Sequence, residues 1–569
     1  MNIQRALKNR MVPRTEETGL KLPSRAADRY IVKRQDQQWV HTSVEELPKL
    51  IGDGVELAVW EDRTTANSGK DGSIQGREIF RINKGADSLL SEVDDLSDFL
   101  DAPELPKTLD LSKPVGRNPG DSYNDIIKEI GNGGYDAKHY TVRVAPDFEK
   151  ETILGLSSMK AEATQDLDSF SLDFLPFPYL AVEVNGEAAT YKHDKNELNV
   201  TPKKPIKDGE EFDVDVLYQG APHEVKESFV FDLPFGMRFV EGALVTISEP
   251  RSTRGWFPCN DHPSDKATFD FELGVPLGYE AHASGLQQSE KHIEGGNARQ
   301  LDFSPKDPMA PYVVALNAFK SEDFESWTQV SSRGVPIENS VPIDSNQSAK
   351  DTLNKTPQIL DFLESFLGDY PFEVLGNHNF KKLFGGAFEA QTRNVYTQRT
   401  MESQRVDLEG PVIHFPTEVV AHETAHQWFG DSVSIGRWRD IWMKEAFATY
   451  FGAAYAAHDF GVDLDQHMST RYERARNRVS GYIPGDPETQ KMYSGDAYNL
   501  MAGGVHALRK ELGDGDFKKV LKTFLTDYAG DSAEITDFVA TCEETTGKDL
   551  KAFFNKWVYA EHLPKRLPE

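Results

Sequence analysis

The sequence predicts a multidomain α+β protein in which an antiparallel β-domain precedes a mainly helical domain. Three observations support this fold class. The chain has 569 residues, too many for one ordinary core, since a domain usually takes about 100 to 200 residues. Its middle part alternates apolar and polar residues with a period of two, as half-buried strands do. Beyond about residue 345 the apolar spacing becomes that of helices.

Residues 1–125 form a first segment whose fold the sequence leaves open. The segment holds few long periodic runs and carries a cluster of acidic residues between 94 and 104. It ends in the Pro- and Gly-bearing stretch 113–120, which is typical of a linker. We therefore expect an N-terminal extension that is separate from the β-domain.

Residues 126–325 are predicted to form the β-domain. The stretches 140–144, 212–216 and 269–273 each alternate apolar with polar side chains. Such alternation suits antiparallel strands with one buried face. Residues 312–319 are almost continuously apolar and are predicted to form a further, more buried strand.

Residues 326–569 are predicted to be mostly helical. Leu360, Leu363 and Leu367 recur at helical spacing, and Gly368 follows them as a stop signal. Two cysteines, Cys259 and Cys542, are too few for a disulfide framework, so we expect buried free thiols.

The composition argues against two classes of partner. A formal net charge of -29 disfavours nucleic acid, because phosphate binding relies on clustered Lys and Arg. No apolar run approaches the roughly 18 to 20 residues of a membrane helix, so no membrane partner is expected. The N-terminus lacks the apolar stretch of about 7 to 15 residues that marks a secretory signal, which predicts a cytoplasmic protein. The oligomeric state is not predictable from these features.

The segment 416–430 contains a metal-binding pattern. Pro416 begins a predicted helix that Gly430 ends, and within it stands the sequence His422-Glu423-Thr-Ala-His426. Residues four apart lie on one helix face, so His422 and His426 can present two imidazoles to one ion, with Glu423 beside them. This is the His-Glu-x-x-His arrangement of zinc peptidases, although such a short pattern can also arise by chance.

A catalytic zinc needs a third protein ligand and an open position for water. The stretch 438–450 is predicted to be a second helix and supplies Glu445 as that ligand. Zinc lowers the pKa of water from 15.7 to about 7, and Glu423 is then the predicted general base. Asp440 and Glu418 could orient a metal-bound histidine, but a surface or capping role suits them equally.

The eighteen residues between His426 and Glu445, together with these motifs, resemble the gluzincin aminopeptidases, the family of aminopeptidase N and leukotriene-A hydrolase. The resemblance spans about residues 130–569. It includes Trp256–Pro263, similar to a Phe-Pro-x-x-Asp-x-Pro segment of the family, and Tyr312–Leu316, similar to the last strand of its β-domain. It implies a saddle-like β-domain, a thermolysin-like catalytic domain and one zinc ion per chain, in a short form without the large C-terminal helical domain.

The resemblance also implies residues that bind the substrate. Gly386-Ala387-Phe-Glu389-Ala resembles a Gly-x-Met-Glu-Asn motif whose glutamate grips the free amine of a peptide, although the Met and Asn are replaced here. Gly386, Ala387 and Glu389 are therefore expected to bind substrate. By the same resemblance, Glu249, nine residues before Pro258, is expected to be a second amine-binding acid. An ordinary salt bridge is the alternative for either glutamate.

Family members place a tyrosine hydroxyl on the oxyanion of the reaction. The stretch 497–509 resembles the helix that carries it, which points to Tyr498. Because the Lys-Gly that usually follows this tyrosine is missing, Tyr493 stays open as the alternative.

The resulting expectation is a zinc aminopeptidase that acts on peptides with a free N-terminus. A zinc endopeptidase or an epoxide hydrolase could use the same metal site, and a non-catalytic binding protein is a third alternative. Glu389 disfavours the endopeptidase, since an amine anchor restricts cleavage to the first residue. The preferred N-terminal residue cannot be derived from the sequence.

Overall fold

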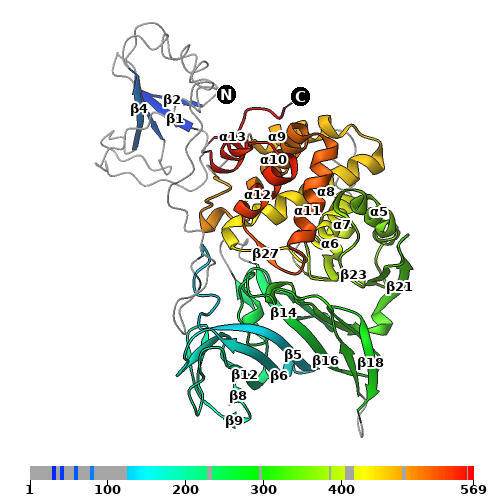
Figure 1. Cartoon of the computed structure of the whole chain (residues 1–569). Coiled ribbons are helices and arrows are strands. Elements are labelled where there is room, and N and C mark those ends of the chain that lie inside the picture. Colours follow the sequence, from blue (N-terminus) through cyan, green and yellow to red (C-terminus); the bar gives the residue numbers. More distant parts are fainter. Residues whose placement is uncertain are drawn as a thin grey trace. The chain divides into compact units, whose positions relative to one another are not determined.

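The structure is a computed structural model (Figure 1). It describes residue 123 and residues 125–568, except 227–232, 294–297, 384–385, 404–414, 477–481 and 561, and before these the backbone of four strands. The chain divides into two compact units, Met1–Pro103 and Glu104–Glu569.

In the first unit, four strands form one antiparallel sheet in the order β2-β1-β3-β4. They are β1 (Arg29–Lys33), β2 (Trp39–Ser43), β3 (Leu57–Glu61) and β4 (Arg77–Ile82). The acidic cluster at 94–104 and the linker at 113–120 lie outside the described residues.

The β-rich part of the second unit is built around an eight-stranded sheet with the order β18-β19-β16-β5-β6-β12-β8-β9. Its strands are β5 (Tyr135–Asp147), β6 (Thr152–Ala163), β8 (Tyr179–Val184), β9 (Glu187–Ala188), β12 (Glu211–Gly220), β16 (Thr268–Pro276), β18 (Gln287–His292) and β19 (Ala298–Phe303). Along β5, Tyr140, Val142 and Val144 are buried while Thr141 and Arg143 are half-buried, as the alternation predicts. Neighbouring strands are antiparallel, except that β16 runs parallel to β5.

A five-stranded sheet in the order β13-β14-β15-β20-β17 and a three-stranded sheet complete this part. The strands are β7 (Phe170–Asp173), β10 (Thr190–Asp194), β11 (Glu197–Thr201), β13 (Val225–Lys226), β14 (Pro234–Val240), β15 (Ala243–Ile247), β17 (Tyr279–Ala283) and β20 (Leu316–Lys320). The strand predicted over 312–319 is wrong at its start. Pro311–Val313 form a 3-10 turn, because Pro311 fixes a helical φ at the first position of the turn, and the strand begins at Leu316.

The helical part opens with a mixed sheet in the order β21-β22-β23-β25-β24. Its strands are β21 (Phe324–Val330), β22 (Pro336–Pro342), β23 (Leu375–Phe380), β24 (Ala387–Phe388) and β25 (Arg393–Thr397), so the predicted domain border at 325 falls within β21. The helices are α4 (Gln347–Leu353), α5 (Thr356–Leu367), α6 (Gln398–Met401), α7 (Phe415–His426), α8 (Trp442–Phe460), α9 (Leu464–Arg476), α10 (Met501–Leu512), α11 (Asp514–Asp527), α12 (Ile535–Thr546) and α13 (Lys551–Phe554). A two-stranded ladder joins β26 (Ser434–Ile435) to β27 (Ser532–Ala533).

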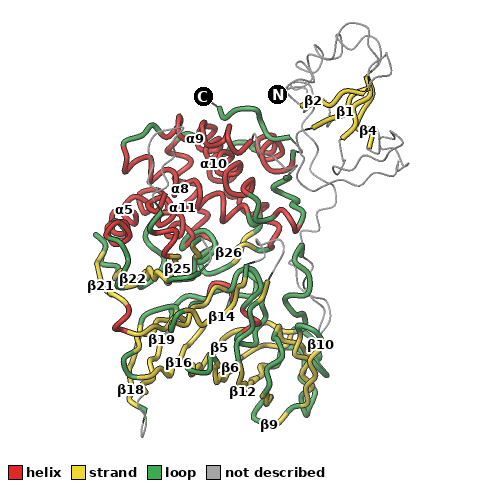
Figure 2. The backbone as a smooth tube through the Cα atoms, turned by 180° about the vertical axis from the view of Figure 1, so that it is seen from behind, coloured by secondary structure: helices red, strands yellow, loops and turns green. Residues whose placement is uncertain are grey.

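Within this second unit, the helices and the large sheets gather in two separate halves (Figure 2). The fold is thus an antiparallel β-domain followed by a mainly helical domain, as the sequence predicts. Both cysteines are buried and free. Among the described residues, the helices are all too short or too polar to cross a membrane.

The close approach of α7 and α8 depends on Gly452. A Cβ atom on this glycine would lie 2.9 Å from the carbonyl oxygen of Glu418 and 3.2 Å from the Cβ atom of His422. Side-chain contacts this short do not occur without movement of the backbone. Gly452 therefore sets the distance between the two helices beside the residues considered next.

Candidate metal centre

Four side chains singled out in the sequence meet where α7 packs against α8. His422, Glu423 and His426 lie on α7, and Glu445 lies in the first turn of α8. The Nε2 atoms of the two histidines are 3.1 Å apart, and Glu445 Oε2 is 3.6 Å from His422 Nε2 and 3.5 Å from His426 Nε2. Three ligand atoms therefore converge on one point.

The outer nitrogens of the two rings both have a partner, and that of His426 fixes its tautomer. His426 Nδ1 lies 2.9 Å from the carbonyl oxygen of Phe429, which can only accept, so Nδ1 carries the proton. His422 Nδ1 lies 3.4 Å from the hydroxyl of Thr449. A metal ion would bind His426 through the Nε2 atom, which the proton on Nδ1 leaves as the acceptor of the neutral ring.

The spacing of the ligand atoms fits zinc. Tetrahedral zinc with bonds of about 2.0 to 2.2 Å to nitrogen and oxygen keeps its ligand atoms about 3.3 to 3.5 Å apart. The three separations in this structure, 3.1, 3.5 and 3.6 Å, lie close to that range. Two imidazoles and one carboxylate are also the donor set of a catalytic zinc, so the residues fit the metal that the sequence predicts.

The electrostatics of the site favour a cation as well. Burial would lower the pKa of His426, but the carboxylates of Glu389 and Glu445 raise it to about 10. Burial likewise would raise the pKa of Glu445, but Lys444 and His426 hold it well below its usual range. Burial raises the pKa of Glu423 well above its ordinary value, and Glu389 and Glu445 add to this effect. The carboxylates of Glu389 and Glu445 thus favour positive charge at His426.

The two predicted amine-binding acids lie beside this centre and share one cation. Lys444, the residue before Glu445, is fully buried and donates hydrogen bonds of 2.6 Å to Glu389 Oε1 and Glu445 Oε1. Its Nζ atom also lies 2.6 Å from Glu249 Oε1, which forms an ion pair. Burial would lower the pKa of Lys444, but these three carboxylates raise it well above its usual value. Lys444 was not among the site residues predicted from the sequence, although a lysine directly before a predicted metal ligand is a signal for one.

Gln427 connects the metal-binding helix to the loop that carries Glu389. Its Oε1 atom accepts a hydrogen bond of 2.8 Å from the backbone N–H of Thr392. Its Nε2 atom donates to the carbonyl of Ala390 at 3.1 Å and to Asn394 Oδ1 at 3.0 Å. Glu389 is therefore held at a fixed place relative to His426.

Gly386 and Ala387 lie at the rim of the same loop and are half-buried. Ala387 belongs to β24, the strand at one end of the mixed sheet, and pairs with Tyr396 on β25. Gly386 donates its N–H to Thr400 Oγ1 at 2.9 Å, and its carbonyl accepts from the backbone N–H of Thr397 at 3.2 Å. Gly386 thereby fixes the start of an edge strand.

Both tyrosines considered for the oxyanion lie near the metal ligands. The ring of Tyr498 stacks beside that of His422, with centroids 6.3 Å apart and an interplanar angle of 20°. Tyr493 is buried, and its hydroxyl group has no hydrogen-bond partner. Tyr498 is half-buried and its ring lies beside that of His422, so the geometry favours it over Tyr493.

The two acids that could have oriented a histidine have other surroundings. Glu418 forms an ion pair with Arg471. Asp440 is buried, and its burial together with the charge of Glu534 raises its pKa to about 7. Thr449 and the Phe429 carbonyl, rather than these acids, contact the outer nitrogens of the two rings.

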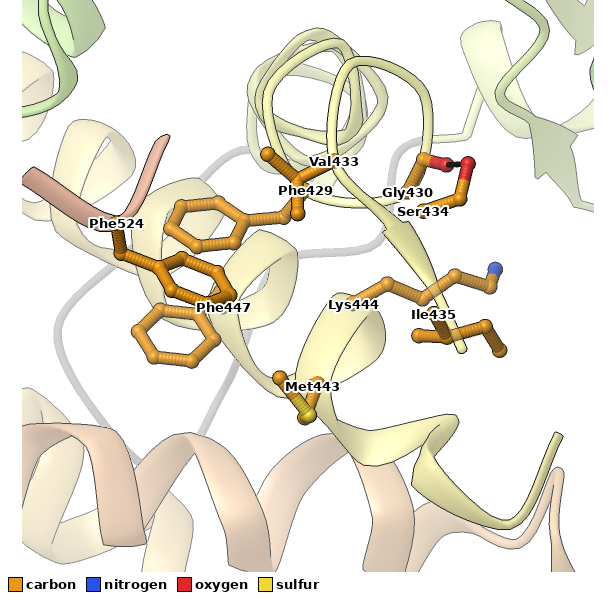
Figure 3. Close-up of a pocket in the computed structure, with 9 residues that line it drawn as sticks. All are labelled: Phe429, Gly430, Val433, Ser434, Ile435, Met443, Lys444, Phe447 and Phe524. Carbon is orange, nitrogen blue, oxygen red and sulfur yellow. Dashed lines mark hydrogen bonds between the residues drawn. The ribbon is translucent and has the colours of Figure 1, made fainter. Parts of the chain in front are cut away.

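Behind the centre lies a small, mostly apolar pocket (Figure 3). Phe429, Phe447 and Phe524 line one side, and the stem of Lys444 passes along the other with its ammonium turned away from the rings. The ammonium's partners lie on the other side: the three carboxylates and the ring of Tyr312, whose centroid is 5.9 Å from Nζ.

Two parts of the chain match known protein families. Residues 136–313 match the Peptidase M1 N-terminal domain, and residues 351–557 match the Peptidase family M1 domain. The chain is 25% identical to glutamyl aminopeptidase of Bos taurus over 323 residues, which cover 55% of this chain and 33% of that protein. It is 23% identical to "Probable aminopeptidase 2" of Sulfurisphaera tokodaii over 436 residues, 74% of this chain and 53% of that protein. The chain thus spans about a third to a half of the length of these relatives.

Solved structures resemble the chain over their whole length. One is a mutant of an M1 zinc metallopeptidase from Deinococcus radiodurans bound to a Tyr-Ser-Ala substrate. It has 26% identity and a TM-score of 0.68, and the match covers 79% of this chain and 100% of that one. Another is a two-domain M1 zinc metallopeptidase mutant bound to L-arginine, with 26% identity, a TM-score of 0.69, and coverage of 79% and 99%.

Proposed function

The chain belongs to peptidase family M1, and on this premise we propose that it is a zinc-dependent aminopeptidase that removes residues from the free N-terminus of peptides. One observation carries the proposal. Two buried carboxylates, Glu389 and Glu249, lie within 2.6 Å of a shared cation immediately beside the metal ligands. A place that binds an ammonium next to a zinc site positions the first peptide bond for hydrolysis.

His422, His426 and Glu445 would hold the zinc ion. When bound, zinc supplies a Lewis acid that polarises the scissile carbonyl and makes water more acidic. Glu423 follows His422 on the same helix. One carboxylate oxygen of Glu423, one of Glu389 and one ring nitrogen of His426 all lie within 4.8 Å of one another. The place of Glu423 beside these groups suits a base that accepts a proton from water and returns it to the leaving amine.

Glu389 and Glu249 anchor the terminal ammonium in this proposal. Ala387 lies on an edge strand, where an extended peptide can add main-chain hydrogen bonds, and Gly386 holds the beginning of that strand. The substrate is thereby fixed at its amine and along its backbone.

Acetylation of the substrate's amine tests the anchor directly. A free aminoacyl-arylamide is expected to be hydrolysed and its N-acetylated form is not, since acetylation removes the charge that Glu389 binds. Glu389→Gln is expected to lower kcat/KM on the free substrate by about 10- to 150-fold, the equivalent of about 1.5 to 3 kcal/mol for one charge-assisted hydrogen bond. Equal turnover of free and acetylated peptides contradicts the proposal and indicates an endopeptidase.

Tyr498 is the proposed donor to the oxyanion. Tyr498→Phe is expected to lower kcat by about 10²- to 10³-fold, because one lost donor typically costs about 2.7 to 4 kcal/mol in the transition state. Tyr493→Phe is the matched control and is expected to change kcat far less. Steady-state kinetics of both variants check the assignment, and a larger loss in Tyr493→Phe would transfer the role to that residue.

A further inference from the structure

Lys444 reaches the place that the proposed function gives to the substrate's ammonium. Its stem leaves α8 and passes Gly430, where an added Cβ atom would lie 3.4 Å from Lys444 Cδ. Its ammonium is fully buried and contacts Glu249, Glu389 and Glu445 at 2.6 Å each. A primary ammonium held by the two anchoring glutamates has the same chemistry as the terminal amine of a peptide.

The carboxylates around Lys444 are not fully satisfied by it. Glu389 and Glu445 each accept an aligned hydrogen bond from Nζ. Glu249 Oε1 lies equally near and forms an ion pair with Nζ, but without the alignment of a hydrogen bond. Glu249 and Glu389 are two carboxyl groups that face one ammonium, and only Glu389 accepts an aligned hydrogen bond from it, which leaves an acceptor for one further cation.

We propose that Lys444 is a specificity-determining residue that competes with the substrate's terminal ammonium for Glu389 and Glu249. This inference rests on the proposed aminopeptidase function. In the site without substrate, Lys444 donates a hydrogen bond to Glu389. An entering peptide donates first to Glu249, which has no aligned hydrogen bond, and then shares Glu389 with the lysine, so part of its binding free energy is offset by the displaced bond.

Lys444 has a second effect through Glu445. One carboxylate oxygen of Glu445 faces the two histidines, while the other accepts the hydrogen bond from Lys444. The lysine therefore links the amine anchor to the metal ligand. Substrates whose amine is weakly basic or blocked gain nothing from displacing it, and the competition selects for strongly basic terminal amines.

The test compares two ligands that differ only in the amine. L-leucinamide and N-acetyl-L-leucinamide are titrated by calorimetry into the zinc-loaded full chain carrying Glu423→Gln, which prevents turnover. When Lys444→Gln is combined with Glu423→Gln, the affinity for L-leucinamide is expected to rise about tenfold, because the ligand no longer competes for one charge-assisted hydrogen bond. The affinity for N-acetyl-L-leucinamide is expected to stay the same. Lys444→Met, which keeps the stem against Gly430, is the second variant and is expected to act in the same way.

Lys266 provides the matched control. Its ammonium is also largely enclosed, but it donates to the backbone carbonyls of Asp431 and Ser432 at 2.7 and 2.9 Å, not to the anchoring carboxylates. Lys266→Gln therefore removes an enclosed lysine without freeing Glu249 or Glu389. Its ratio of affinities for the two ligands is expected to equal that of the parent protein.

The outcomes separate this inference from the proposed function. If the parent protein prefers the free amine and neither Lys444 variant increases that preference, the competition is refuted while the aminopeptidase stands. If the parent protein binds both ligands equally, the amine anchor is absent and the proposed function falls, together with the inference. In active enzyme, the same variants are expected to lower KM for aminoacyl-arylamides more than they change kcat, a split that a general loss of stability does not produce.

Discussion

Glu423→Gln is expected to lower kcat by about 10²- to 10⁴-fold, the usual contribution of a general acid–base group. Glutamine keeps the size and the polarity of the side chain but cannot accept a proton from water. The parent carboxylate is buried within 4.8 Å of the ring of His426, where it can reach water beside the metal ligands. Steady-state hydrolysis of an aminoacyl-arylamide at neutral pH measures the loss.

The loss of activity can be assigned to the missing base only if Glu423→Gln still binds zinc. Glu423 lies beside His422 but is not one of the three converging ligands, so elemental analysis is expected to find the parent amount of zinc. KM is expected to change little, because Glu389 and Glu249 still bind the amine. A Glu423→Gln protein that contains zinc and turns over substrate at the parent rate would show that another group is the base.

The convergence of His422, His426 and Glu445 could be predicted from the sequence because local rules determine it. Two histidines four residues apart on a helix must share a face, whatever the rest of the fold does. Glu445 followed from the need for a third ligand on a neighbouring helix. The alternation of apolar residues likewise predicted the strands of the β-domain, since side chains of a strand alternate between two faces.

The surroundings of the ligands could not be predicted, because they depend on contacts between distant segments. The ion pair between Lys444 and Glu249 joins α8 to the loop after β15, nearly 200 residues earlier in the chain. Gln427 and Gly452 act through backbone groups of other elements, and a backbone contact leaves no mark in residue type. Parallel pairing of β16 with β5 is invisible for the same reason, since alternation is identical for both strand directions.

His426→Ala is expected to remove zinc from the protein and to reduce hydrolysis to below about one hundredth of the parent rate, since even loss of a group that only orients a ligand costs about 10- to 100-fold. The remaining His422 and Glu445 offer two ligands, too few for a stable tetrahedral site. Elemental analysis of the purified protein and kinetics with added zinc measure the two effects. Because the ligand itself is missing, added zinc is not expected to restore the parent rate.

His506 is the matched control for this substitution, because it is a buried histidine of α10 that pairs with Asp465 and lies outside the ligand set. His506→Ala removes an equal volume from the interior and is expected to lower the thermal stability while the zinc content stays that of the parent. The comparison separates loss of a ligand from loss of packing. Zinc retained in His426→Ala, or lost in His506→Ala, would mean that the converging imidazoles on α7 are not what binds the metal.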